Sequence, residues 1–306
     1  MSVKPQAPGG PAGNRPRSTV LSLAEKRRRG EPITMVTAYD YPTARAVDES
    51  GIDAILVGDS LAMVVLGHPN TLAVTMDEML HHARAVSRGA SHALLIGDMP
   101  FMSYQSDPAA AVRNAGRFLQ EAGMHAVKLE GGRPFSETVR GIVRAGIPVQ
   151  GHIGLTPQSL NALGGFKVQG RTAEAARGLL DDALALEDAG CFSLVLESVP
   201  ERLATYITGR VGIPTIGIGA GAGTGGQVLV SHDLLGLYDD IAPRFAKRYA
   251  ELGQAVRQAL AAYRQDVETG AFPAPEHAYA MPDDEWRSFL AALGEAHPKP
   301  VAGGRR

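Results

Sequence analysis

The stretch AILVGDS at residues 54–60 is followed by TMDEMLHHARAVSRGA (75–90) and then by ALLIGDMP (93–100). The first and third segments are apolar runs without polar alternation, which is typical of strands buried on both faces of a parallel sheet. The middle segment repeats its apolar residues at helical spacing. This stretch therefore predicts a strand–helix–strand unit whose two strands lead into Asp59 and Asp98.

The same unit recurs along the chain. Further apolar runs are ITMVTAYD (33–40), AVKLEGG (126–132), IPVQGHIGL (147–155), FSLVLESVP (192–200), IPTIGIGAG (213–221) and QVLVSHDLLG (227–236). Four of the helical patterns between them end in Ser-Gly or Ala-Gly, at Gly51, Gly123, Gly146 and Gly190, which is a common way to end a helix. Eight such units predict an α/β fold, a (β/α)₈ TIM barrel, whose usual length is about 250 residues. A doubly wound open sheet is the alternative, with fewer strands and a different ligand crevice.

The predicted barrel spans residues 18–272 as a single domain and includes a long last helix at 243–270. Before it, residues 1–17 lack apolar periodicity and are expected to form a disordered arm. A short helix is expected at 22–29, with Ser22 as its N-cap and Glu25 completing a capping box. After the barrel, residues 273–306 are expected to form a C-terminal strap and a loose tail.

Composition excludes several classes of protein. The 306 residues include 30 Lys and Arg against 32 Asp and Glu, a formal net charge of −2, which gives no electrostatic footprint for nucleic acid or for an anionic membrane. No run approaches the ~20 apolar residues of a membrane helix, and the N-terminus has no apolar stretch of the kind found in secretory signals. A single cysteine cannot form an internal disulfide and suits a reducing compartment, so we expect a cytoplasmic protein.

The functional residues of a (β/α)₈ barrel lie at the C-terminal ends of its strands. The polar residues that the sequence places there, as candidates for the site, are Asp59, Ser60, Asp98, Lys128, Glu130, His152 and Glu197. An Asp or Ser after a strand often caps the next helix instead, and Asp40 fits that role. Lys128 lies inside an apolar run, where a lysine is rarely buried without a partner. Glu130 follows two residues later and so points to the same side of the strand.

The acids at these strand ends predict a metal site. Asp59, Asp98 and Glu130 end consecutive strands about 4.8 Å apart, so they crowd within roughly 10 Å. Clustered carboxylates repel one another unless a cation or protons intervene, and oxygen ligands favour a hard ion, Mg²⁺ first. Lys128 then suits an anionic group of the substrate, and Glu197, across the mouth of the barrel, suits a general base. The residues predict metal-assisted proton abstraction from a small anionic oxo-acid.

The motifs around these residues resemble those of the ketopantoate hydroxymethyltransferase family. They are VGDSLAMVVLGHPNTLAVT, DMPFMSY, VKLEGG, GHIGLTPQS, FKVQGR, VLESVP and IGIGAG, and the resemblance spans about residues 18–280. It implies a (β/α)₈ barrel that binds Mg²⁺ and transfers a hydroxymethyl group from 5,10-methylenetetrahydrofolate to 3-methyl-2-oxobutanoate, giving 2-dehydropantoate for pantothenate biosynthesis. It also implies a homodecamer.

The resemblance assigns roles residue by residue. Asp59 and Asp98 correspond to metal ligands that also touch the substrate, and Glu130 completes the metal environment, partly through water. Ser60, Lys128 and His152 correspond to residues that contact the substrate or lie beside it. Glu197 corresponds to the proton acceptor.

Other activities remain open from the residues alone. An Mg²⁺-dependent phosphoenolpyruvate mutase or isocitrate-lyase-like C–C lyase would share the carboxylates, but such enzymes commonly carry a cysteine in a flexible loop, and Cys191 directly precedes a strand. A Schiff-base aldolase using Lys128 and a non-catalytic barrel that binds an oxo-acid or folate are further alternatives. The glycines of GAGTGG (221–226) match a dinucleotide-binding fingerprint, but QVLVSHD after them predicts a strand, not the required helix.

Overall fold

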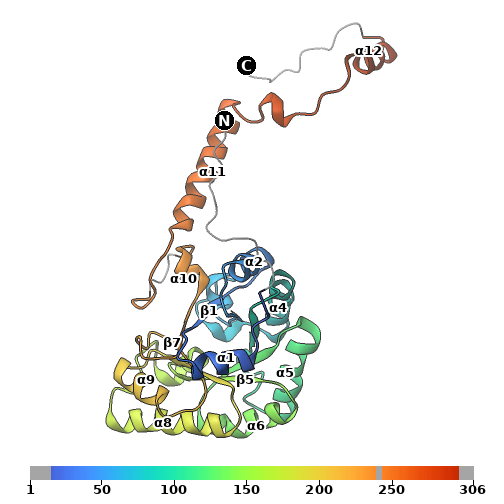
Figure 1. Ribbon diagram of the computed structural model, residues 1–306. Coiled ribbons are helices and arrows are strands. Elements are labelled where there is room, and N and C mark those ends of the chain that lie inside the picture. The colour runs from blue at the N-terminus through green and yellow to red at the C-terminus, as the bar shows by residue number, and fades with distance from the viewer. Residues whose placement is uncertain (1–14, 239–242, 296–306) are drawn as a thin grey trace. The chain divides into compact units, whose positions relative to one another are not determined.

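A computed structural model describes residues 15–238 and 243–295, and its strands close into a barrel in chain order (Figure 1). The strands are β1 (Ile33–Thr37), β2 (Ala54–Val57), β3 (Leu94–Asp98), β4 (Ala126–Glu130), β5 (Val149–Gly154), β6 (Ser193–Glu197), β7 (Thr215–Ile218) and β8 (Gly226–Leu229). Each strand pairs in parallel with the next, and β8 pairs with β1. The predicted (β/α)₈ TIM barrel is thereby confirmed, and the open sheet is excluded.

Helices connect the strands and cover the outside of the barrel. They are α2 (Tyr41–Glu49), α3 (Leu61–Val64), α4 (Met76–Gly89), α5 (Pro108–Ala122), α6 (Ser136–Arg144), α7 (Leu160–Leu163), α8 (Ala173–Asp188), α9 (Glu201–Thr208) and α10 (Ser231–Leu235), with short 3₁₀ turns η1 (Thr71–Ala73), η2 (Arg133–Phe135) and η3 (Pro157–Ser159). Figure 1 shows α4, α5, α6, α8 and α9 following one another around the strands. None of the helices in the described part of the chain is long and apolar enough to cross a membrane.

Two apolar layers hold the barrel together. Alternate strand side chains fill its interior, among them Met35, Leu56, Ile96 and Ile216. The other layer lies between the strands and the surrounding helices, which explains why the strand sequences are apolar without alternation. Leu23, from helix α1 (Val20–Arg28), joins the interior layer and is 1% exposed.

Helix α1 begins earlier than predicted. The expected start at Ser22, with Glu25 completing the capping box, is wrong, because Thr19 is the N-cap and its hydroxyl accepts a hydrogen bond from Ser22 N at 3.1 Å. The Ser22 hydroxyl accepts in return from Thr19 N at 2.8 Å. Thr caps helices nearly as well as Ser, so this reciprocal pair moves the helix start toward the N-terminus.

Strand β8 starts directly at the last glycine of GAGTGG. A side chain on Gly226 would collide with the carbonyl oxygen of Ile33 in β1, so only glycine allows the two strands to pair here. A strand and not a helix follows these glycines, as predicted, whereas a dinucleotide fingerprint needs a helix there. The predicted run at 227–236 is nevertheless too long for one strand, since β8 ends at Leu229 and α10 begins at Ser231.

The chain divides into two compact units, Met1–Tyr249 and Ala250–Arg306. The long helix expected at 243–270 is wrong in its first part, because α11 spans Leu252–Thr269 only. Tertiary contacts hold the preceding segment instead: the Phe245 ring lies over Gly219, and Tyr249 N donates to Leu234 O at 2.8 Å. Helix α11 therefore belongs to the second unit, with η4 (Pro275–His277) and α12 (Asp283–Ala292), whereas the sequence placed it inside a barrel ending at 272.

The expected disordered arm at 1–17 and the loose end of the 273–306 segment lie largely outside the described residues. Of the arm, only residues 15–17 are described, and Arg15 Nη2 donates to Ile52 O at 2.9 Å.

A buried carboxylate, Asp48, ties α2 to the segment before β3. It accepts backbone hydrogen bonds from Ser91 at 3.0 Å, His92 at 3.0 Å and Ala93 at 2.7 Å, and it faces His92 Nδ1 at 2.9 Å. Burial acts to raise the pKa of Asp48, but these hydrogen bonds outweigh it and hold the pKa below its usual 3.8. The ionised form of Asp48 therefore stabilises the folded barrel.

The variant Asp48→Asn is expected to lose about 2–3 kcal/mol of unfolding free energy near neutral pH, because an NH₂ group replaces an acceptor oxygen that faces donors. A lowered folded pKa gives a contribution that is complete above the unfolded pKa of about 3.9 and is lost as pH falls through the lower folded value. Urea denaturation should show a constant difference from wild type down to about pH 5 and a shrinking one below pH 4. Asp40→Asn is the control: Asp40 is the exposed N-cap of α2, and Asn caps equally well.

Candidate active site

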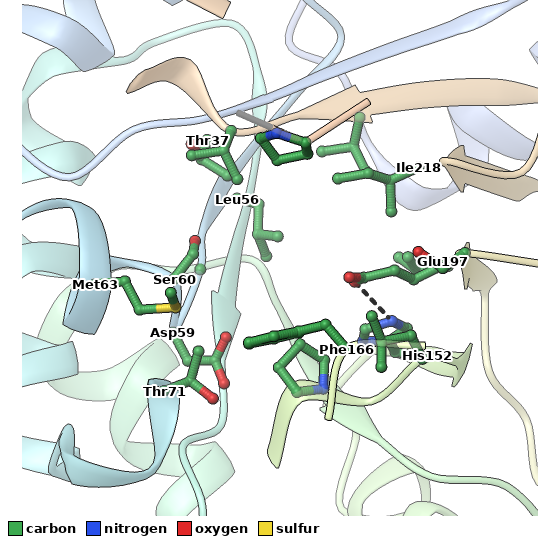
Figure 2. Close-up of a pocket in the computed structure, with 18 of the residues that line it drawn as sticks. Thr37, Leu56, Asp59, Ser60, Met63, Thr71, His152, Phe166, Glu197 and Ile218 are labelled. Carbon is green, nitrogen blue, oxygen red and sulfur yellow. Dashed lines mark ion pairs between the residues drawn. The ribbon is translucent and has the colours of Figure 1, made fainter. Parts of the chain in front are cut away.

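A cavity of about 370 Å³ lies at the C-terminal ends of the barrel strands. It is lined by every site residue that the sequence predicted: Asp59, Ser60, Asp98, Lys128, Glu130, His152 and Glu197. Figure 2 shows Asp59 and Ser60 on one side of this cavity and His152 and Glu197 on the other. The strand-end argument therefore found side chains that share one site.

Strand register brings Lys128 and Asp98 together, because these residues are partners across β3 and β4. Lys128 Nζ donates to Asp98 Oδ1 at 2.7 Å and to Oδ2 at 2.8 Å, and both side chains are at most 4% exposed. Burial acts to lower the pKa of Lys128, but Asp98, Glu130 and Asp59 together raise it above its usual value. Lys128 is therefore a fixed ammonium with a buried partner, as its place inside an apolar run predicted.

The acids of the site outnumber its lysine. Asp59, Asp98 and Glu130 are all buried, and Lys128 contacts Asp98 and Glu130. Glu130 Oε1 lies 3.7 Å from Lys128 Nζ. Burial first, and then the neighbouring Asp98 and Glu130, raise the pKa of Asp59 well above its usual value. This raised pKa marks uncompensated negative charge at the position of Asp59, which a cation would relieve.

His152 lies between the acids of strands β4 and β6. Its Nδ1 is 3.4 Å from Glu130 Oε1, and its Nε2 is 3.3 Å from Glu197 Oε2, the contact dashed in Figure 2. Neither ring nitrogen has hydrogen-bonding geometry to any described residue. Burial and Lys128 act to lower the pKa of His152, but the two carboxylates raise it to about 9. The imidazolium form therefore links Glu130 to Glu197.

The Ser60 hydroxyl is held by the segment that follows β1. Tyr39 OH lies 2.8 Å from Ser60 Oγ, and burial raises the pKa of Tyr39 above its usual value, so this phenol stays protonated. A Cβ at Gly58 would lie 2.8 Å from Ser60 Oγ, so a larger residue there would displace the Ser60 hydroxyl. After the opposite strand β6, Ser198 has φ +50°, a left-handed conformation that is strained for a serine and follows directly on Glu197.

Several residues of the site are not at strand ends, and the sequence reasoning missed them. Gln158 in η3 and Tyr104 in the β3–α5 loop are buried beside Asp59 and Glu130. Phe166 lies in the long loop after β5, and Phe245 comes from the segment after α10; both line the cavity. GHIGLTPQS, quoted among the motifs, contains Gln158, but a loop residue gives no strand-end signal.

The segment Ser231-His232-Asp233, which follows β8, contributes one residue to the cavity. Asp233 lines the cavity, and burial raises its pKa to about 6 although Arg248 acts to lower it. Asp40, in contrast, is the N-cap of α2, and its Oδ1 accepts from Thr43 N at 2.8 Å. The capping role predicted for Asp40 is confirmed.

The carboxylates of the cavity suit a metal ion only as a pair. Within residues 15–238 and 243–295, no group of three or more His, Cys, Asp or Glu side chains is arranged to hold an ion by itself. Asp59 and Asp98 remain suitable as a pair: Asp98 Oδ2 accepts from Asp59 N at 3.1 Å, so the two residues adjoin. Mg²⁺ commonly uses one or two carboxylates, with waters and substrate oxygens filling the other positions. The residues fit such an ion with two direct protein ligands.

Solved structures resemble the barrel at low sequence identity. A phosphonopyruvate hydrolase in complex with oxalate and Mg²⁺ is 15% identical, with a TM-score of 0.58, covering 90% of this chain and 98% of that one. A 2,3-dimethylmalate lyase, described as a member of the PEP mutase/isocitrate lyase superfamily, is 17% identical with a TM-score of 0.54, covering 90% and 95%. At these identities the likeness shows the fold alone.

Sequence comparison is far more specific. The chain is 61% identical over 270 residues to 3-methyl-2-oxobutanoate hydroxymethyltransferase of Oleidesulfovibrio alaskensis, covering 88% of this chain and 92% of the relative. It is 59% identical over 263 residues to the protein of the same name from Syntrophobacter fumaroxidans, covering 86% and 93%. Residues 17–275 match the family model described as ketopantoate hydroxymethyltransferase. With this match across nearly the whole barrel, the chain belongs to the ketopantoate hydroxymethyltransferase family.

Proposed function

We propose that this enzyme transfers a hydroxymethyl group from 5,10-methylenetetrahydrofolate to 3-methyl-2-oxobutanoate, giving 2-dehydropantoate for pantothenate biosynthesis. The observation that carries the proposal is the single cavity in which buried Asp59, Asp98 and Lys128 lie opposite Glu197. This arrangement combines a place for an anionic oxo-acid with a carboxylate across from it. The names of the relatives support the same substrate.

We propose Asp59 and Asp98 as ligands of Mg²⁺, with Glu130 acting through water. Support comes from the excess of buried carboxylates and from the raised pKa of Asp59, which burial and its acidic neighbours cause. Glu130 accepts a hydrogen bond from Gln158 N at 2.9 Å and lies 3.4 Å from His152, so its carboxylate is held in place in the lining of the cavity. Bound Mg²⁺ would supply the positive charge that stabilises a developing enolate.

We assign a separate role in the reaction to each of the other residues of the site. Lys128 attracts the carboxylate of the oxo-acid, and Ser60 offers its hydroxyl to a substrate oxygen. Glu197 accepts the proton from C3 of the oxo-acid, with His152 beside it at 3.3 Å. The methylene carbon is bonded to two folate nitrogens. One of these C–N bonds opens to give an iminium, and the C3 carbanion, in its enolate form, attacks the iminium carbon to form the C–C bond. Water then replaces the second nitrogen, supplying the hydroxyl oxygen and leaving tetrahydrofolate.

The folate co-substrate has a suitable surface at the cavity. Phe166 and Val168 line it, although each is about half exposed, and Lys167 lies between them in the sequence. Exposed aromatic and aliphatic side chains suit a flat pterin ring, and a lysine suits the carboxylates of a glutamate tail. These residues support the proposal that folate binds at the mouth of the cavity.

The alternative activities fit this site less well. Cys191, the one cysteine of the chain, is 3% exposed and does not line the cavity, and burial raises its pKa to about 12, so a lyase mechanism using a cysteine has no support. A Schiff base needs a neutral amine, whereas Lys128 is held as an ammonium by Asp98. A non-catalytic binding protein would not need Glu197 opposite the acids.

An assay of product formation tests the proposed function. The purified protein should form 2-dehydropantoate from 3-methyl-2-oxobutanoate and 5,10-methylenetetrahydrofolate, and EDTA should abolish the reaction until Mg²⁺ is restored. Retention of radioactivity on Lys128 after borohydride reduction with labelled oxo-acid would instead favour the aldolase, and Mg²⁺-dependent cleavage of isocitrate would favour the lyase. Binding of the oxo-acid without turnover would favour the sensor.

We further propose a cytoplasmic homo-oligomer, with the decamer expected from the resemblance. Helix α11 carries an apolar face, on which Leu252, Val256, Leu260, Tyr263 and Val267 recur at helical spacing, and a face of this kind suits contact with another subunit. Size-exclusion chromatography with light scattering measures this state directly.

A further inference from the structure

Gln158 makes a complete set of side-chain hydrogen bonds beside the acids. Its Nε2 donates to Asp59 Oδ2 at 2.9 Å and to Met99 O at 3.0 Å. Its Oε1 accepts from Tyr104 OH at 2.8 Å and from Gln105 Nε2 at 3.0 Å. An amide has two N–H donors and an oxygen with two lone pairs, so this side chain has no capacity left and only one orientation.

The same residue also holds the second acid. The backbone N–H of Gln158 donates to Glu130 Oε2 at 2.9 Å. Tyr104 OH, which fixes the Gln158 amide, also accepts from Glu130 N at 3.1 Å and lies 3.0 Å from Glu130 O. Gln158 is 4% exposed and Tyr104 is 1% exposed, so bulk water does not compete with these bonds.

We propose that Gln158 is the positioning residue for the acidic side of the site: it fixes Asp59 and Glu130 in the orientation that binds the metal ion. This inference rests on the proposed function. The Asp59 carboxylate is pinned through Oδ2, while Oδ1 has no hydrogen bond from any described residue and stays available for a ligand. Gln158 touches Asp59 through its side chain and Glu130 through its backbone, so it fixes the spacing between both.

The orientation of the Gln158 amide decides whether a donor or an acceptor faces the Asp59 carboxylate. Because Oε1 is occupied by Tyr104 and Gln105, only the NH₂ group can face Asp59. A donor at this position favours the ionised carboxylate, the form that ligates a cation. Outer-shell partners of this kind typically account for about 10- to 100-fold in metal affinity.

Gln158→Met tests the inference, because methionine keeps the length of the side chain and removes every hydrogen bond of the amide. Mn²⁺ serves as the probe, and the free ion is measured by electron paramagnetic resonance. We expect Gln158→Met to weaken Mn²⁺ binding by about 10- to 100-fold. Asp59→Asn replaces a proposed ligand and should weaken Mn²⁺ binding further. It therefore shows how much affinity is lost when a ligand itself is removed.

Gln150→Met is the matched control. Gln150 is also a fully buried glutamine in the same part of the chain, but its Nε2 donates to Ser193 Oγ at 2.9 Å, and it does not line the cavity. We expect Gln150→Met to bind Mn²⁺ as wild type does, even if its melting temperature falls. A loss of affinity that followed melting temperature in both variants would show a merely structural role and overturn the inference.

Tyr104→Phe is the second variant, in case Gln158→Met does not fold. It keeps the ring packed against Phe135 but releases one of the two donors that fix the Gln158 amide, so Mn²⁺ binding should weaken in the same direction and by less. Normal Mn²⁺ affinity in both folded variants would contradict the positioning role. If wild type itself bound no Mn²⁺, the metal part of the proposed function would fail, which is a different result.

Discussion

Replacing Glu197 by glutamine is expected to slow exchange of the C3 hydrogen of 3-methyl-2-oxobutanoate with solvent by about 10²- to 10⁴-fold, the usual contribution of a general base. The amide keeps the shape of the side chain but cannot accept the proton. Glu197 is 17% exposed and lies across the cavity from Asp59, so its loss leaves the acidic side of the site in place. Exchange is followed by proton nuclear magnetic resonance in D₂O, with Mg²⁺ and without folate.

The affinity of the variant for the oxo-acid shows whether it has lost only the base or the whole binding site. Glu197→Gln should bind 3-methyl-2-oxobutanoate with nearly unchanged affinity, measured by isothermal titration calorimetry. Glu201→Gln is the control, since Glu201 lies in the first turn of α9 and does not line the cavity, and its exchange rate should match wild type. Exchange at the normal rate in Glu197→Gln would show that another group removes the proton.

Lys128→Met is expected to lower the unfolding free energy of the metal-free protein by about 3–5 kcal/mol, the usual result of removing one partner of a buried ion pair. The substitution leaves Asp98, 1% exposed, without its ammonium and next to Asp59 and Glu130. Urea denaturation in EDTA measures the loss. The double variant Lys128→Met/Asp98→Asn should regain part of it, because the most affected carboxylate is then neutral.

A second lysine–aspartate pair provides the matched control. Lys26 Nζ lies 2.6 Å from Asp53 Oδ2, but these side chains are 23% and 13% exposed. Water screens this pair, so Lys26→Met should cost about 1 kcal/mol or less. Equal losses for Lys26→Met and Lys128→Met would mean that burial of the Lys128 pair carries no special penalty, contrary to its geometry.

The barrel itself was predictable from the sequence, because each βα unit carries its own signal. Apolar runs without alternation mark strands buried on both faces, and glycines mark the helix ends, as the positive φ of Gly51, Gly123, Gly146 and Gly190 confirms. The boundaries of the helices did not follow from the sequence in the same way. The start of α1 depends on which of two neighbouring hydroxyls caps the helix, and the segment at 243–249 has a helical pattern but is held against the barrel by Phe245 and Tyr249.

The candidate site was partly predictable for a similar reason. Strand ends of a barrel meet at one mouth, so a polar residue at the end of each apolar run had to lie near the others. The strand-end argument alone therefore groups Asp59, Asp98, Lys128 and Glu197, and all four line one cavity. That Lys128 has a buried partner also follows from a charge that cannot be buried alone, but the register of β3 and β4 decided that this partner is Asp98.

The sequence by itself therefore determined the barrel, the edge of it that carries the chemistry, and the acids and lysine found there. Only the tertiary structure decided which groups hold those residues in place: Gln158 and Tyr104 behind the acids, and His152 between Glu130 and Glu197. The physical reason is the distance along the chain over which each interaction acts. Strand and helix patterns are local properties of the chain, whereas the hydrogen bond from Gln158 to Asp59 joins residues 99 positions apart and exists only once the barrel has closed.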